Sequence, residues 1–226
     1  MNFKQIFTSS LGKKFTMGLT GLFLISFLVI HCTINSMIFF NDGGEMFRYY
    51  AHFMSHNYIV RVLEIGLFAG LIAHIIQGLM LWQQNSAARP VKYAVNAAST
   101  NSKWYSRSMG LLGTLLLFFL ILHVSKFFVN TKIALYGNGG ENDAEYNLYV
   151  EMKEYFQQLW AVIAYLLGVV SLFWHLLHGF PSAFQTLGLN HKKYTPIIRF
   201  AGTAFSIIVC ILFALMPIAF YTDWLQ

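Results

Sequence analysis

The chain has 226 residues, of which 57% are hydrophobic and only 11% are Asp, Glu, Lys or Arg. Soluble domains carry about 25% of these charged residues, so the composition argues against a soluble protein and favours one that lies in a membrane. The net charge is +6, but the basic residues are confined to a few short segments. This distribution indicates membrane topology and argues against nucleic acid as a partner.

Uncharged runs of the sequence are long enough to cross a bilayer, which takes about 20 helical residues. In chain order they are 15–40, 65–88, 108–125, 155–190 and 200–222. The first run is too long for a signal peptide and is expected to remain as a span. The fourth is too long for one straight helix, and we expect Pro181 to end that helix. The sequence therefore predicts an all-α bundle of five transmembrane helices, forming one domain over residues 1–226.

The segments that join these runs differ in charge. Three segments contain basic residues and no acidic ones, and the nine acidic residues lie on the other side. The positive-inside rule then predicts a cytoplasmic N-terminus and a C-terminus outside. The basic residues concerned are Lys4, Lys13 and Lys14, then Arg89, Lys92, Lys103 and Arg107, and finally Lys192, Lys193 and Arg199.

Four histidines lie deep inside four separate apolar runs, where an ionisable side chain indicates a functional site. His31 and His123 come 17 and 16 residues after the last basic residue before runs that enter from the cytoplasm. His74 and His175 come 17 and 18 residues after the predicted outer ends of the two returning runs. With a rise of about 1.5 Å per residue, the first pair lies near the outer face and the second near the cytoplasmic face. Depth therefore pairs His31 with His123, and His74 with His175.

Two histidines on facing helices of a bundle favour a haem iron with two axial imidazoles, which suits electron transfer. Zinc is less favoured, because a structural zinc site takes four ligands. The alternative without a metal is that each histidine is hydrogen-bonded inside a packed bundle. The two cysteines, Cys32 and Cys210, lie in apolar runs without a CxxC spacing, so they indicate neither a disulfide framework nor covalently attached haem.

The sequence resembles one known family over nearly its whole length. The shared features are Gly12-Lys13-Lys14, the string Thr20-Gly21-Leu22-Phe23-Leu24 before His31, and the spacing from His175 to Gly179 and on to Leu187-Gly188. Together with the four spaced histidines, they are similar to the five-helix, di-haem cytochrome b anchor of succinate dehydrogenases and fumarate reductases, which is the membrane subunit of complex II.

This resemblance implies a ligand set and partners. It implies two haem b groups, with His31, His74, His123 and His175 as axial ligands; His178, one turn beyond His175, is the alternative fourth ligand. It also implies a flavoprotein subunit, an iron–sulfur subunit docked on the cytoplasmic face, a membrane quinone, for which menaquinone is expected, and a place as a multi-pass protein in the inner membrane of a bacterium. Succinate chemistry itself is not expected on this chain.

Other polar residues near the histidines are candidates for supporting roles. Glu64, ten residues before His74, is the expected proton-transfer group near the quinone; the alternative is a carboxylate paired with Arg61 at the interface. Lys126 is a candidate partner for a haem propionate or a lysine that reaches the interface. Asn35 and Gln77, each about one turn from a histidine, are candidates for contact with the outer and inner haem respectively.

Two rival functions remain open from the sequence. Another di-haem cytochrome b subunit, of a hydrogenase or formate dehydrogenase, would have the same haem sites with different soluble partners. A haem-free transporter would use the histidines as relays, but transporter helices are commonly interrupted near the middle of the membrane, and no proline lies at mid-span here.

Overall fold

The computed structural model describes residues 9–87, 103–137 and 146–225. In these ranges five helices are long and apolar enough to cross a membrane. The predicted all-α architecture with five such helices is thus confirmed. They are α2 (Ser10–Asn35) with the 3₁₀-helix η1 (Ser36–Phe40), α4 (Tyr58–Ala87), α7 (Met109–His123) with its continuation, α10 (Leu159–Thr186) and α11 (Tyr194–Tyr221).

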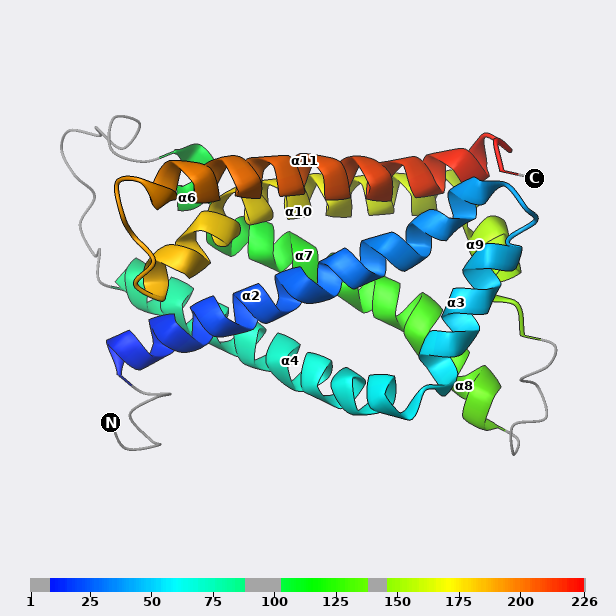
Figure 1. Ribbon diagram of the computed structural model, residues 1–226, viewed down its shortest axis with the longest axis horizontal. Helices are drawn as coiled ribbons and strands as arrows, with labels where there is room; N and C mark the ends of the chain where they lie inside the picture. The colour runs from blue at the N-terminus through cyan, green and yellow to red at the C-terminus, as the bar shows by residue number, and fades with distance from the viewer. Residues whose placement is uncertain (1–8, 88–102, 138–145, 226) are drawn as a thin grey trace.

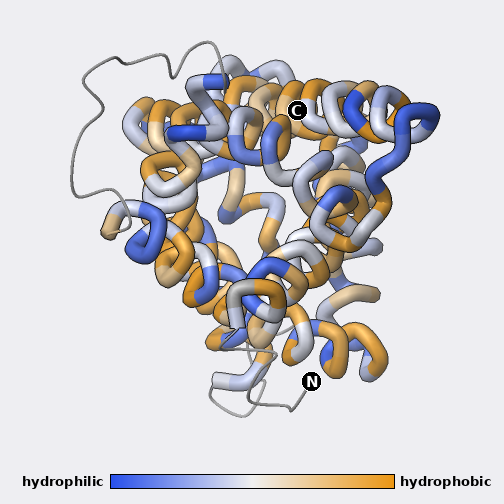
Figure 2. The backbone as a smooth tube through the Cα atoms, turned by 90° about the vertical axis from the view of Figure 1, so that its left-hand side faces the viewer, coloured by the Kyte–Doolittle hydropathy of each residue, from blue (hydrophilic) through white to orange (hydrophobic). Residues whose placement is uncertain are grey.

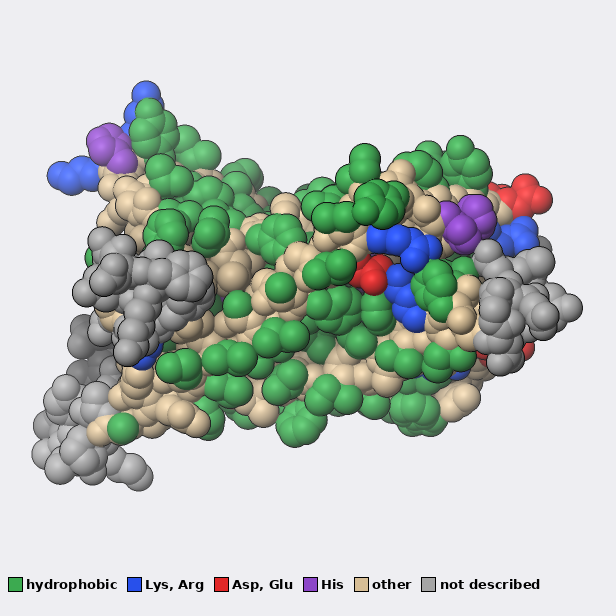
Figure 3. Space-filling model, turned by 90° about the horizontal axis from the view of Figure 1, so that it is seen from below, with side chains coloured by type: hydrophobic (Ala, Val, Ile, Leu, Met, Phe, Trp, Pro, Cys, Tyr) green, Lys and Arg blue, Asp and Glu red, His purple; other side chains and the backbone are tan. Residues whose placement is uncertain are grey.

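The helices run roughly along one axis of the molecule (Figure 1). α10 and α11 pack along each other, while α2 lies against α4 and α10, and α7 against α10. Figure 2 looks along the bundle and shows hydrophobic segments on every side. On the face seen in Figure 3, hydrophobic side chains form a broad band across the middle, with most charged side chains and the histidines nearer the two ends. Such a band is suited to contact with lipid.

Pro181 does not end the fourth span, which corrects the expectation from the sequence. It lies inside α10, which continues to Thr186. A proline costs a helix one N–H donor, and neighbouring helices make this tolerable in membrane proteins. The helix ends instead at Thr186, and the chain turns at Gly188, whose φ is 85°. The amides of Gly188 and Leu189 reach back to the carbonyls of Gln185 and Phe184, at 3.1 and 3.0 Å, as in a Schellman motif.

The third span is longer than the sequence indicates. After His123 the helix passes through one π-helical stretch, η2 (Val124–Val129), and continues as α8 (Asn130–Tyr136). Lys126 and Lys132 lie beyond the uncharged run, but each forms an ion pair with a carboxylate from another helix. Pairing lets the helix carry both charges, and the span therefore extends beyond the predicted end at residue 125.

The short helices α3 (Glu45–His56) and α9 (Leu148–Phe156) gather at one end of the bundle (Figure 1). His52 and His56 both lie on α3. Before α3, Asp42 accepts hydrogen bonds from the amides of Gly44 and Met46 at 3.0 and 2.9 Å. Helix α9 is capped by Asn147, whose side chain accepts hydrogen bonds from the amides of Tyr149 and Val150.

A buried cluster of aromatic and aliphatic side chains joins α3, α9, α10 and α11 at this end. Its members include Ile38, Phe47, Tyr149, Phe156, Tyr165 and Phe220. The basic segments lie toward the opposite end, but Lys4, Arg89 and Lys92 fall outside the described residues, as do Glu141, Asp143 and Glu145. The side of the membrane on which each terminus lies therefore stays a prediction.

The buried cluster can be tested with two phenylalanines on α11. The side chain of Phe220 is 0% exposed and that of Phe200 is 77% exposed. Phe220→Ala leaves a cavity and is expected to lower the free energy of unfolding by about 3–5 kcal/mol. Phe200→Ala, which removes a lipid-facing ring, should change it little. Thermal unfolding in detergent measures both; equal effects of the two substitutions would contradict the packing of this end.

Candidate functional site

His31 and His123 face each other near the end of the bundle that carries α3 and α9. His31 lies on α2 and His123 is the last residue of α7. Their ring centroids are 5.7 Å apart and their planes are nearly perpendicular, at 89°. Phe27 and Phe119, each four residues earlier on the same helix, stack against the two imidazoles. The pair is thus enclosed by apolar rings.

His74 and His175 form a second pair further along the bundle. His74 lies on α4 and His175 on α10, and their ring centroids are 6.3 Å apart. Glycines lie beside both rings: a Cβ at Gly21 would be 3.6 Å from His74 Cε1, and one at Gly113 would be 4.0 Å from His175 Cε1. The absence of these side chains leaves space beside the pair.

His178 does not take part in this second pair. Its Nε2 lies 3.3 Å from Ser182 Oγ, one turn further along α10. Of the two candidates on this helix, His175 is therefore the one that faces His74. The distances within both pairs agree with the pairing that depth predicts, while the role of these residues as metal ligands stays a prediction.

The two pairs lie at different depths. Thr20 contacts His74, and His31 follows Thr20 by eleven residues on the same helix. Eleven residues make about three turns, so both positions are on one face of α2 and about 16 Å apart along its axis. Helix α7 gives a similar spacing, because Gly113 lies beside His175 and His123 follows ten residues later.

The contacts of Thr20 favour one tautomer of His74. The Thr20 hydroxyl donates to the carbonyl of Thr16 at 2.8 Å, and its oxygen lies 3.1 Å from His74 Nδ1. A hydroxyl has one proton to donate, so toward His74 it acts as acceptor and Nδ1 carries the hydrogen. His74 Nε2 then holds the free lone pair, which is the form in which histidine binds a metal.

The other three imidazoles have different surroundings. His123 Nδ1 lies 3.3 Å from the hydroxyl of Tyr165. Asn35 donates to the backbone carbonyl of His31 at 2.8 Å, and its amide nitrogen is 3.5 Å from His31 Nδ1. His175 Nδ1 is buried and meets no hydrogen-bond partner among the described residues. A buried polar atom without a partner is costly, so this atom could accept or donate a hydrogen bond to a further group.

Both pairs fit an iron held between two imidazoles. Metal–imidazole bonds of about 2.0–2.1 Å, one on each side of the ion, give ring centroids about 6 Å apart. The observed separations are 5.7 and 6.3 Å. Within the described ranges, no group of three or more His, Cys, Asp or Glu side chains could hold a metal ion. Two imidazoles are the number of protein ligands that a bis-histidine haem takes.

Gln77 adds to the polar groups near the second pair. It lies one turn beyond His74 and is the only buried side chain of α4, a helix that is described along its whole length. Its Oε1 has no hydrogen-bond partner in the part of the chain that the structure describes. Hydrocarbon offers none either, so this amide is suited to contact a polar edge of a bound group.

Glu64 and Lys126 are both ion-paired. Glu64 binds Lys132 of α8 at 2.7 Å, so it does not pair with Arg61, the alternative considered from the sequence. Lys126 binds Glu151 of α9 at 2.8 Å and lies over the ring of Tyr155. Burial raises the pKa of Tyr155, which keeps this phenol neutral. A haem propionate would have to compete with Glu151 for Lys126.

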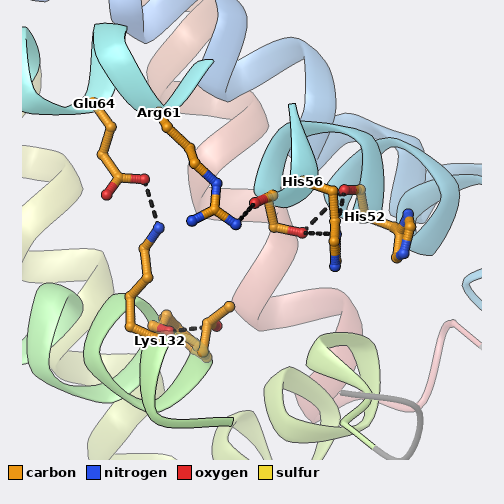
Figure 4. A network of polar contacts seen from close by, with 8 residues as sticks. His52, His56, Arg61, Glu64 and Lys132 are labelled. Carbon is orange, nitrogen blue, oxygen red and sulfur yellow. Dashed lines mark hydrogen bonds and ion pairs between the residues drawn. The ribbon is translucent and has the colours of Figure 1, made fainter. Parts of the chain in front are cut away.

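Arg61 connects α4, the helix that also carries Glu64, to α3. Its Nη2 donates to the carbonyl of Ser55 at 3.1 Å, and its guanidinium lies over the ring of Tyr136, 4.6 Å from the centroid. Figure 4 shows Glu64, Arg61 and Lys132 gathered where α3, α4 and α8 meet. Lys132 was not singled out from the sequence, because its partner is 68 residues away and only the fold brings the two together.

The π-helical stretch η2 directly follows His123. Stretches of this kind occur frequently at functional sites, and the extra residue changes the register of the helix beyond it. Here it changes the direction of Lys126 and Lys132 relative to His123. Neither this stretch nor the contacts of Thr20 and Tyr165 could be recognised in the sequence, although Thr20 belongs to the string that carries the resemblance.

Comparisons with known proteins identify no relative. No protein-family model matches the sequence, no curated protein is similar to it, and no solved structure matches the fold.

The hydrogen bond from His74 to Thr20 can be tested through the tautomer. We expect the wild-type chain, prepared without cofactor and labelled with ¹⁵N-histidine, to show His74 with Nδ1 protonated. Thr20→Val removes the acceptor and should abolish this preference, at a cost of about 1–3 kcal/mol in stability. Thr20→Ser keeps the hydroxyl and should retain it. An unchanged ¹⁵N spectrum in Thr20→Val would show that another group orients the ring.

Proposed function

We propose that this chain is a di-haem cytochrome b that carries electrons between an iron–sulfur subunit and a membrane quinone, as the membrane anchor of a succinate:quinone oxidoreductase. The observation that carries the proposal is the presence of two facing histidine pairs, separated along a bundle of membrane-spanning helices. Each pair joins two helices, and their centroid separations of 5.7 and 6.3 Å suit an iron between the rings. The family resemblance supplies the identity of the soluble partners.

The residues of the chain have separate roles in this proposal. His31 and His123 would hold one haem b, and His74 and His175 the other. When bound, each haem supplies a centre that takes up and gives back one electron. Thr20 keeps Nε2 of His74 free of a proton and Tyr165 lies against Nδ1 of His123, so both act as positioning residues. The packed aromatic side chains exclude water from the outer pair.

Gln77 and Asn35 would contact the edges of the two haems. Gln77 is suited to this role by its buried, unpartnered Oε1. Asn35 already donates to the carbonyl of His31, which places its amide at the outer pair. Lys126 would shift between Glu151 and a propionate, and His178 would lie beside the inner group. A haem propionate is negatively charged, so basic and hydrogen-bonding neighbours would stabilise it.

Quinone chemistry requires a group that transfers protons, and Glu64 is the proposed group. The Glu64 side chain is 30% exposed and its partner Lys132 is 23% exposed. The ion pair with Lys132 holds the carboxylate in place. Quinone reduction would take protons through this carboxylate, and quinol oxidation would release them there. By the resemblance, menaquinone is the expected quinone.

The proposed orientation of the chain rests on its charges. With Lys14, Lys103, Arg107 and Lys192 on the cytoplasmic face, the iron–sulfur subunit would dock there and the flavoprotein would bind through it. The N-terminus would be cytoplasmic and the C-terminus outside, in the inner membrane of a bacterium. Lipid would cover the exposed apolar faces, including that of α4, on which only Gln77 is buried.

A dithionite-reduced-minus-oxidised optical spectrum of the purified chain tests the haem assignment. We expect a b-type band equivalent to two haems. His31→Ala and His123→Ala should each lose one haem, and the double variant should lose no more than either single one. His31→Ala combined with His74→Ala should lose both. No b-type band in the wild type would refute the assignment, and crossed losses would refute the pairing.

The soluble partners need a separate measurement on the whole complex. Succinate should reduce the haems of the purified complex, which should contain flavin and iron–sulfur clusters. A b-type spectrum that does not respond to succinate would instead assign the chain to another di-haem oxidoreductase, such as a hydrogenase or formate dehydrogenase. That outcome would not affect the proposed haem ligands and would change only the proposed soluble partners.

Glu64→Gln tests the proton-transfer role. We expect quinol-linked turnover to fall about 100-fold, the lower end of the usual effect of removing an acid or base, while haem content stays unchanged. Glu151→Gln is the matched control, because it removes the carboxylate of the neighbouring lysine pair and should retain turnover. Equal losses in both variants would indicate that breaking an ion pair, and not the loss of a proton carrier, lowers the rate.

A further inference from the structure

Arg61, near the start of α4, is a cation that forms no ion pair within the described ranges. Glu64, three residues further along α4, is bonded to Lys132 at 2.7 Å. The other ion pair in these ranges joins Lys126 to Glu151. Arg61, Lys132 and Glu64 lie together where α3, α4 and α8 meet (Figure 4), and we call them the Arg61 cluster. With two cations and one carboxylate, the cluster carries a net positive charge.

Two contacts hold the guanidinium of Arg61 in place. Its Nη2 donates to the carbonyl of Ser55 at 3.1 Å, and its central carbon lies 4.6 Å from the centroid of the Tyr136 ring. A guanidinium has several N–H donors, and the bond to Ser55 uses only one of them. The others are available to an anion. A side chain that is already held in place loses less conformational freedom when it binds one.

The Arg61 cluster lies at the edge of the apolar surface of the bundle. Figure 3 shows Lys and Arg side chains around one acidic side chain, bordered by hydrophobic side chains, toward one end of the molecule. Tyr58 begins α4 and is 79% exposed, and Tyr136, in contact with Arg61, is 49% exposed. Exposed tyrosines at the end of a span are typical of the membrane interface. The cluster is therefore at the depth of the lipid headgroups.

An exposed apolar stripe of α4 runs from the Arg61 cluster toward the middle of the membrane. Ile65, Ile72 and Ile76 follow Arg61 by four, eleven and fifteen residues, which are spacings that return to nearly the same face of a helix. Their side chains are 73%, 54% and 51% exposed. From residue 65 to residue 76 the helix rises by about 16 Å. The hydrocarbon core is about 30 Å thick, so the stripe is as long as the acyl chains of one leaflet.

We propose that the Arg61 cluster and the isoleucine stripe of α4 form a binding site for one anionic phospholipid. The phosphate accepts hydrogen bonds from the guanidinium, whose planar fork matches phosphate oxygens. One acyl chain lies along the three isoleucines and gains apolar contact that a free phosphate ion lacks. The net positive charge of the cluster favours a lipid with a net negative charge over a zwitterionic one. The site uses none of the histidines, so it is independent of the proposed haem ligands.

Titration of the full chain in detergent with dioleoyl-phosphatidylglycerol, followed by native mass spectrometry, tests this site. We expect one lipid to bind more tightly than any further copy, and more tightly than dioleoyl-phosphatidylcholine does. Arg61→Gln removes the charged donor and should weaken this first binding step by about tenfold. Arg48→Gln is the matched control, because it removes an exposed arginine of α3 at the same end of the bundle. It should bind as the wild type does.

A second variant tests the part of the site that would hold the acyl chain. Ile72→Ser places a polar group in the stripe and should also weaken the first binding step. Leu63 is 55% exposed and lies on the opposite face of α4 from residue 72, so Leu63→Ser should not weaken it. Ile72→Ser leaves every contact of Arg61 in place, and it therefore tests the site even where Arg61→Gln disturbs the end of α3.

Inorganic phosphate distinguishes a lipid site from a site for a free anion. In millimolar excess it should not displace the bound phosphatidylglycerol, and displacement would assign the site to a free anion and overturn the proposal. Wild-type affinity in Arg61→Gln or Ile72→Ser would also overturn it, as would an equal loss in Arg48→Gln or Leu63→Ser. Equal first-step affinity for phosphatidylcholine, or no tighter first step in the wild type, would do the same.

Discussion

The cost of placing a polar group in hydrocarbon governs this structure. A side chain that can form hydrogen bonds finds no water inside the membrane, so it must face another polar group or a bound ligand. His74 meets Thr20, and His123 meets Tyr165. His175 Nδ1 and Gln77 Oε1 meet nothing in the part of the chain that is described. Both unpartnered atoms lie at the second histidine pair or one turn from it, which is where an additional group is best supported.

Ion pairs solve the same problem at one end of the bundle. The third span carries Lys126 and Lys132 beyond its apolar part, and each lysine meets a carboxylate from a different helix. Each is partly exposed, so each pair contributes little to stability. The ion pairs fix the positions of helices instead. They hold Glu151 of α9 and Glu64 of α4 against the third span. The proton-transfer role proposed for Glu64 depends on this placement.

The sequence was sufficient to predict the features that depend on local composition. Uninterrupted apolar runs predicted the five long helices, and counting from charged residues predicted which histidines meet. It was insufficient wherever contacts distant in the chain decide the outcome. Pro181 was expected to end α10, because the packing that tolerates it is not visible locally. The predicted end of the third span, at residue 125, was too early, because its two lysines are paired with Glu64 and Glu151 of other helices. Helix α3 was missed, because only one of its side chains, Phe47, is buried.

Helix α2 links the two histidine pairs. One face of it carries Thr20 and Gly21, which lie beside His74, and three turns later His31, which faces His123. A rigid helix therefore sets the distance of about 16 Å between the two sites. Shifting α2 by one residue would rotate both contacts away together, so neither site can be adjusted alone. In a di-haem protein, the same constraint would hold both centres at a constant separation while the rest of the bundle moves in the membrane.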